Sequence, residues 1–166
     1  FFELLTLNMA RQGFFGEIVH CEGAYIHSIA ENLTRKDFKW EMWRLKANYE
    51  RKGNLYPTHG LGPVCQVMNI NRGDKLDYLV SMSSADFVLG QRLNELAEKD
   101  DSYKPFAGKN YRGNMNTSII KTHHGKTIML QHDVSSPRPY SRIHLVSGTK
   151  GTAQKYPLPG RISTNH

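Results

Sequence analysis

Three segments of β-type sequence follow one another in the last third of the chain, and they restrict its possible folds more than any other feature. Their predicted limits are 116–122, 126–133 and 141–147. His124-Gly125 forms a tight turn between the first two, and Gly148 to Gly151 turn the chain after the third into a short return strand over residues 152–156. Because tight turns join antiparallel neighbours, this region predicts a meander of strands.

Two earlier strands and two helices are predicted before this meander. Period-two alternation indicates the strands, and apolar residues at helical spacing indicate the helices. The strands are expected over 17–26 and 76–82, and the helices over 58–69 and 84–99, with Thr58 and Ser84 as N-caps. Helices interspersed with strands, followed by a strand meander, predict an α+β fold with an open, mainly antiparallel sheet.

The pattern between these elements is weaker. Residues 32–39 are polar and are predicted to form a loop. An aromatic cluster that includes Trp40 and Trp43 leads into one or two helical turns over 46–52, which Gly53 would end. Pro63 is tolerated in its predicted helix only if it lies in the first turn.

The net charge of +7, from 22 Lys and Arg against 15 Asp and Glu, first suggests a polyanionic partner. Residues 1–101 hold 12 basic and 14 acidic side chains, whereas residues 102–166 hold 10 basic side chains and one acidic one, Asp133. The basic residues form no block, and no zinc-finger, helix-turn-helix or RNP-like motif is present, which argues against nucleic acid. No stretch of about 18 apolar residues predicts a membrane span. Two distant cysteines exclude a disulfide framework and a cysteine-rich zinc site.

The segment from Gly53 to Pro63 contains the clearest candidate for chemistry. It places Tyr56 and His59 three residues apart at the predicted start of a helix. A helix N-terminus disfavours the histidine cation, so His59 could act as a general acid or base, with Tyr56 as a hydroxyl ligand or second proton carrier. The alternative is a capped helix in which His59 is a hydrogen-bonded structural residue.

A second candidate is the loop after the strand at 126–133. Two prolines stiffen the chain around Arg138, which could pair with a carboxylate or phosphate, and Tyr140 could reach a ligand. The alternative is a rigid surface loop. His132 and Asp133 are poor metal co-ligands because adjacent strand residues point to opposite faces, and the same holds for His123-His124; no metal site is expected.

Two further groups have a functional and a structural interpretation. Tyr25 and His27 share one face at the end of a predicted strand, where a buried tyrosine with a satisfied hydroxyl is the simpler interpretation. Around Trp43 and Arg44, aromatic faces could stack on a sugar ring while the guanidinium bridges hydroxyls, although such clusters usually belong to the core. The chain has no P-loop, no G-x-G-x-x-G, no G-x-S-x-G and no outstanding carboxylate pair.

Five segments together are similar to one known family, over about residues 3 to 163. They are 20–27, 42–45, 53–63, 68–74 and 131–140. They resemble glycoside hydrolase family 109, the bacterial NAD-dependent α-N-acetylgalactosaminidases built on the Gfo/Idh/MocA oxidoreductase fold.

The resemblance implies a division of labour between domains. In that family an N-terminal Rossmann domain holds NAD, and a C-terminal α/β domain with an open sheet and helices on one face supplies the sugar pocket. Residues 1–166 would be this second domain, incomplete at both ends and inactive alone. The basic part of the chain would then face a missing domain or a subunit partner, and a homo-oligomer through the sheet is expected.

The resemblance also implies a reaction and a set of residues. NAD takes hydride from sugar carbon 3, the proton on carbon 2 is removed, the aglycone leaves carbon 1, water adds, and NADH returns the hydride. The sugar-binding positions implied are Tyr25, Arg44, Tyr56, Pro57, Thr58, His59 and Tyr140. Tyr56 and Tyr140 would also approach the nicotinamide; His59, with Tyr56, would transfer the proton at the carbon 3 hydroxyl, and Tyr25 would be the carbon 2 base.

Other functions stay open. A related Gfo/Idh/MocA dehydrogenase or hydrolase would act on a different sugar, and a non-catalytic fragment would only bind carbohydrate or oligomerise. The resemblance implies an N-acetylgalactosamine-containing glycan as partner and leaves the localisation open, export included.

Overall fold

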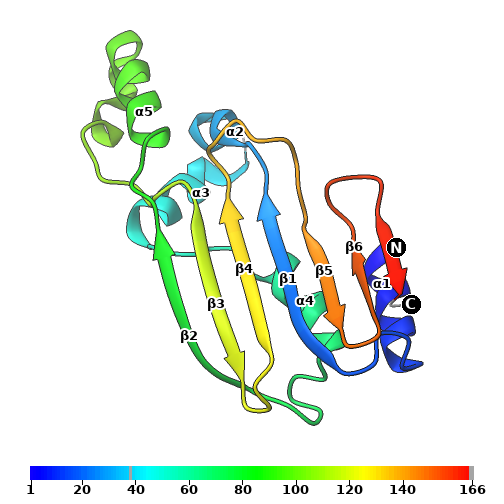
Figure 1. Cartoon of the computed structure of the whole chain (residues 1–166). Coiled ribbons are helices and arrows are strands. Elements are labelled where there is room, and N and C mark those ends of the chain that lie inside the picture. The colour runs from blue at the N-terminus through cyan, green and yellow to red at the C-terminus, as the bar shows by residue number, and fades with distance from the viewer. Residues whose placement is uncertain (38, 165–166) are drawn as a thin grey trace.

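A single open sheet organises the chain (Figure 1). The computed structural model describes residues 1–37 and 39–164, with only the backbone for 39–41. The seven strands have the order β2-β3-β4-β1-β5-β6-β7. Their bounds are β1 Ile18–Ile26, β2 Leu76–Ser83, β3 Asn116–Thr122, β4 Thr127–Asp133, β5 His144–Gly148, β6 Gly151–Gln154 and β7 Arg161–Thr164. Among the described strands, β1 and β4 are the one parallel pair, which confirms the predicted mainly antiparallel sheet.

The helices leave one face of the sheet open (Figure 1). α4 packs on β1, β4 and β5, and α1 packs on α4. α2 and α3 lie together near the end of the sheet where β1 and β4 terminate, and α5 lies at the corner beyond β2. The bounds are α1 Phe2–Arg11, α2 Ala30–Thr34, α3 Lys39–Glu50, α4 Thr58–Val67, α5 Leu89–Lys99 and a 3-10 helix, η1, Asp101–Phe106.

The core has two parts. One lies between the sheet and the α1–α4 layer, and its buried members include Phe15, Cys21, Val64, Met68, Ile128 and Val146. The other lies at the end of the sheet, and its members include Tyr25, Leu33, Leu45, Leu89, Leu93 and Tyr111. Burial against the sheet therefore stabilises α4, while α2, α3 and α5 depend on the second cluster.

Two glycines bring α4 unusually close to β1. A Cβ atom added to Gly23 would lie 2.6 Å from the carbonyl oxygen of Gly60, and one added to Gly60 would lie 2.8 Å from the backbone nitrogen of Ala24. Both distances are shorter than real Cβ contacts. The missing side chains therefore set the depth at which the start of α4, and His59 with it, sits over the end of β1.

The strand predictions are mostly confirmed, whereas the helix boundaries differ. The third strand of the meander, β5, begins at His144 rather than 141, and the return strand, β6, ends at Gln154. α1 had no predicted counterpart. The predicted loop over 32–39 is wrong at its start, because residues up to Thr34 belong to α2, and Phe38 lies outside the described residues. α3 runs from Lys39 to Glu50, so it begins within the predicted loop, well before residue 46, and ends before Gly53. Its Leu45 is buried in the second core cluster.

The predicted caps are also wrong. The N-cap of α4 is Pro57, without a side-chain bond, so Thr58 is its first residue and Pro63 falls in its second turn. α5 begins five residues after Ser84, and the carboxylate of Asp86 accepts the N–H groups of its first turn. The Ser84 hydroxyl instead accepts a hydrogen bond from the backbone N–H of Met115, just before β3. No helix within the described part of the chain is long and apolar enough to cross a membrane.

Candidate functional site

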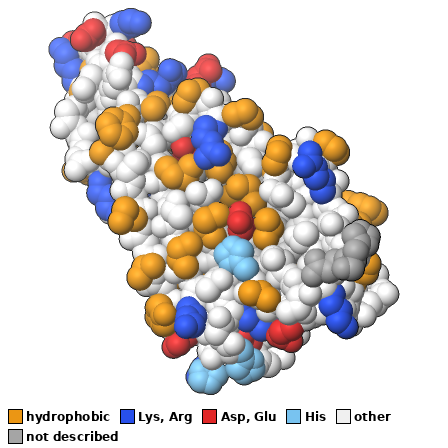
Figure 2. Space-filling view, viewed as in Figure 1, with side chains coloured by type: hydrophobic (Ala, Val, Ile, Leu, Met, Phe, Trp, Pro, Cys, Tyr) orange, Lys and Arg blue, Asp and Glu red, His pale blue; other side chains and the backbone are white. Residues whose placement is uncertain are grey.

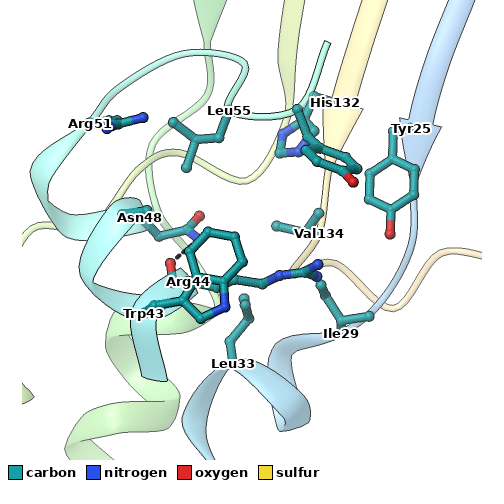
Figure 3. Close-up of a pocket in the computed structure, with 12 residues that line it drawn as sticks. Tyr25, Ile29, Leu33, Trp43, Arg44, Asn48, Arg51, Leu55, His132 and Val134 are labelled. Atoms are coloured by element: carbon teal, nitrogen blue, oxygen red, sulfur yellow. Dashed lines mark hydrogen bonds between the residues drawn. The ribbon is translucent and has the colours of Figure 1, made fainter. Parts of the chain in front are cut away.

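A pocket opens at the end of the sheet, between α3 and the last residues of β1 and β4 (Figure 3). From α3 come Trp43, Arg44 and Asn48, and Arg51 follows directly after its last residue; the Arg44 side chain extends across the pocket toward the strands. The remaining lining residues are Tyr25, Ile29, Leu33, Ala47, Leu55, Tyr56, His132 and Val134. This lining combines aromatic and aliphatic surface with arginines, and the side chains that the structure describes there include no carboxylate.

Three residues singled out from the sequence form one aromatic cluster at this pocket. The ring centroids of Tyr56 and His59 are 4.6 Å apart, those of Tyr25 and His59 are 4.8 Å apart, and those of Tyr25 and Tyr56 are 5.3 Å apart. Tyr56 and His59 meet because they flank the start of α4, whereas Tyr25 arrives from β1. The close approach of the backbones at Gly23 and Gly60 brings the start of α4 into contact with β1.

His59 is held neutral in this cluster. Burial lowers the pKa of the His59 imidazole, and the positive charge of Arg142 lowers it further. The helix N-terminus invoked from the sequence is not the cause found here. A neutral imidazole has one free lone pair, so His59 can accept a proton from a hydroxyl group at neutral pH.

His132 lies behind Tyr25, and the sequence did not predict this contact. The two residues are register partners on the parallel strands β1 and β4, with ring centroids 6.1 Å apart. His132 is only 2% exposed, and burial lowers its pKa to about 3, assisted by the charge of Arg112. Its Nδ1 is buried without a hydrogen-bond partner in the described structure. Asp133 accepts the backbone N–H groups of Ser135 and Ser136 instead of sharing a site with His132.

The loop between β4 and β5 contributes to the same cluster from the other side. Tyr140 contacts His27 with centroids 5.0 Å apart, and the Nδ1 of His27 is hydrogen-bonded to the Tyr25 hydroxyl at 3.2 Å. Arg142 lies against both tyrosines of this row, Tyr25 and Tyr140. Its local sequence does not distinguish it from Arg138, so only the structure identifies it.

Some predicted residues lie beside the pocket rather than in it. Thr58 is exposed on the first turn of α4, and Pro57 is its half-buried N-cap; neither lines the pocket. Arg138 is exposed and lines a separate groove with Tyr140 and Tyr156. Of the aromatic cluster in α3, Trp43 and Arg44 line the pocket and Met42 is in the core, while the side chains of Trp40 and Glu41 lie outside the described residues.

The arrangement suits a polar ring-shaped ligand. Trp43 and Tyr56 offer exposed aromatic surface, and the Arg44 guanidinium offers hydrogen-bond donors beside them. The groups able to carry protons are a histidine and tyrosines. Hydrolysis through an oxocarbenium ion needs two carboxylates flanking the bond, and the lining side chains that the structure describes do not provide them.

Comparison with known sequences gives one consistent family. The family model described as "Glycosyl hydrolase 109, C-terminal domain" matches residues 2–164. An "Alpha-N-acetylgalactosaminidase" of Bacteroides fragilis is 52% identical over 163 residues, which cover 95% of this chain and 37% of that protein. A "Glycosyl hydrolase family 109 protein" of Shewanella sp. (strain W3-18-1) is 50% identical over 99% of this chain and 35% of its own length. The chain thus spans little more than a third of these relatives.

Solved structures share the fold at low identity. Levoglucosan dehydrogenase, in complex with NADH and levoglucosan, superimposes with a TM-score of 0.62 at 12% identity, over 97% of this chain and 43% of that one. An NAD-binding oxidoreductase from Klebsiella pneumoniae gives 0.60 at 17% identity, over 91% of this chain and 36% of that one. These likenesses confirm the predicted α+β fold with an open, mainly antiparallel sheet.

Proposed function

Since this chain belongs to the glycosyl hydrolase 109 C-terminal domain family, we propose that it supplies the sugar pocket and proton-transfer residues of an α-N-acetylgalactosaminidase. The proposed reaction is the NAD-dependent one, with oxidation at carbon 3, elimination, addition of water and re-reduction. The observation that carries the proposal is the cluster of Tyr25, Tyr56 and His59 beside a pocket whose described lining holds no carboxylate. Such a site fits proton transfer to and from a sugar ring better than direct hydrolysis.

Each residue of the site has a separate role in the proposed reaction. Neutral His59 takes the proton of the carbon 3 hydroxyl, and Tyr56, with its ring 4.6 Å away, helps to hold that hydroxyl. Tyr25 passes its hydroxyl proton to Nδ1 of His27, 3.2 Å away, and its phenolate oxygen removes the proton on carbon 2. The electron pair of that C–H bond then forms the double bond to carbon 1 as the aglycone leaves with the bonding pair of the glycosidic bond. Arg44 and Trp43 bind the ring from α3. The ligand is an N-acetylgalactosamine-containing glycan.

The fit of NAD to this chain can be tested on its exposed aromatic rings. Tyr56 is 39% and Tyr140 41% exposed, so each leaves part of a flat ring open next to the cluster, as a contact for nicotinamide requires. NAD, when bound, supplies the hydride acceptor and donor for carbon 3. With no glycine fingerprint in the sequence, the rest of the dinucleotide must be held by another domain.

The first experiment measures release of p-nitrophenol from its α-N-acetylgalactosaminide by the intact protein, with NAD present and with NAD stripped. We expect release that depends on NAD and no accumulation of NADH. Net formation of NADH without release would instead favour a sugar dehydrogenase of the same fold.

A second experiment addresses His59. His59→Ala should abolish turnover while NAD stays bound, and His123→Ala, which changes an exposed histidine in the β3–β4 turn, is the matched control. Full turnover by His59→Ala would remove His59 from the proposed mechanism.

We also propose that the open face of the sheet binds a second copy of the chain. Side chains on this face form a row across neighbouring strands, in which Val80 pairs with Ile119 and Ile119 with Met129. Val80 is 63% and Met82 81% exposed, and Figure 2 shows hydrophobic side chains spread over β2, β3 and β4. An isologous pair would cover this surface on both copies at once. Sedimentation of the intact protein should show an oligomer that Val80→Glu dissociates; a strict monomer contradicts the proposal.

A further inference from the structure

Arg142 occupies a central place in the candidate site. It lies in the loop between β4 and β5, and its guanidinium carbon is 5.8 Å from the ring centroid of Tyr25 and 5.6 Å from that of Tyr140. Both distances fall in the range of cation–π attraction. One side chain thus contacts two aromatic residues that come from different strands and loops of the site.

No carboxylate within the described part of the chain pairs with Arg142. Among the described residues it forms no ion pair, and its Nε is buried without a hydrogen-bond acceptor. The N–H groups of a buried arginine with a purely structural role normally donate hydrogen bonds to carboxylates or carbonyl groups. The positive potential of Arg142 therefore acts on the site around it.

His59 is the titratable group on which this potential acts most clearly. Tyr56 and, from β1, Tyr25 contact His59 directly. The next groups outward are His27, just after β1, and His132 on β4, which both contact Tyr25, and Tyr140 and Arg142 in the β4–β5 loop. Of these, Arg142 is the charged group that lowers the pKa of His59, in addition to burial.

We propose that Arg142 is a positioning residue of this site, which holds the rings of Tyr25 and Tyr140 in place and imposes a positive potential on His59. It prepares a neutral imidazole beside oriented phenol rings. The kinetic consequence rests on the proposed function, whereas the effect on His59 does not.

The decisive measurement is therefore the titration of His59 itself, followed by NMR in the intact protein with isotope-labelled histidine. The His59 signal is assigned by its loss in His59→Gln. In the wild-type protein we expect His59 to titrate below the ordinary histidine range, and in Arg142→Gln we expect its pKa to rise. Arg138→Gln removes an exposed arginine from the same loop and should leave the titration unchanged.

Arg142→Lys separates the two parts of the proposal. Lysine keeps the charge but lacks the flat guanidinium that packs against rings. We expect a His59 titration close to that of the wild type and a lower kcat, since a misplacement of about 1 Å can cost on the order of 100-fold in rate. In Arg142→Gln the acidic limb of kcat/KM should also move to higher pH, because His59 then becomes protonated earlier.

Three results would overturn the proposal. One is a wild-type His59 that titrates at or above the ordinary range, which needs no variant and so does not depend on whether one folds. Another is a His59 titration that is the same in Arg142→Gln and Arg138→Gln. The third is wild-type kinetics in both Arg142 variants. Absence of glycosidase activity with the expected shift of His59 would refute the proposed function alone.

Discussion

Replacing Gly60 by alanine tests whether the close approach of α4 to β1 builds the site. A Cβ at this position would lie 2.8 Å from the backbone nitrogen of Ala24 and from the carbonyl carbon of Gly23, and 2.7 Å from Cδ1 of Leu130. Leu130 can change rotamer, but the two backbone atoms belong to the middle of the sheet and cannot. Ordinary contacts begin at 3.4 Å, so the start of α4 must move outward by about 0.6 Å.

The size of the effect follows from this overlap. Forcing an extra methyl group into a packed interface typically costs about 1–3 kcal/mol. For 166 residues the entropy of unfolding is about 0.35 kcal/mol/K, so the melting temperature should fall by about 3–9 °C. Since His59 precedes Gly60 directly, turnover should fall as well, by up to about 100-fold.

The assay is thermal unfolding followed by circular dichroism, with Gly62→Ala as the matched control. Gly62 lies in the same helix, and a Cβ there would meet nothing within 4 Å. Alanine favours a helix by up to about 1 kcal/mol, but the following Pro63 disfavours a side chain in this conformation, so the net change should stay within about 1 kcal/mol. If Gly60→Ala melts within 1 °C of Gly62→Ala, the contact does not position α4, and the reasoning fails.

Two further predictions concern stability. Burial, with a smaller contribution from Lys155, lowers the pKa of His144 to about 4, against about 6.5 in an unfolded chain. As the pH falls, the unfolded state therefore takes up the proton before the folded state does. The free energy of unfolding should fall as the pH drops from about 6.5 to about 4. In His144→Gln, whose amide can keep the 2.7 Å bond to Thr6, urea midpoints across this range should change less with pH; an unchanged profile would contradict the assignment. Asp86→Ala removes the acceptor of the N–H groups of Val88, Leu89 and Gly90 and should cost about 1–2 kcal/mol, whereas Asp86→Asn keeps an acceptor oxygen and should cost less in the same melting experiment; equal losses would contradict a cap.

The elements that sequence reasoning located correctly are those with a strong local signal. β2, β3 and β4 alternate with period two and are bounded by turn residues, so their limits were predictable to within about a residue or two. Tyr56 and His59 were predictable as neighbours, since both flank the start of one helix. α2 and the beginning of α3 were not, because short helices form where tertiary packing stabilises them and their local preference is weak.

The sequence by itself therefore determined the fold class, the strands of the meander and the pair formed by Tyr56 and His59. Only the tertiary structure decided that Tyr25 contacts this pair and that His132 and Arg142 contact Tyr25 in turn, because each comes from a different strand or loop far away in the chain. The lowered pKa of His59 also depends on the tertiary structure. A sequence pattern reports local backbone preference, whereas burial and the charge of a distant arginine depend on which segments the sheet brings side by side.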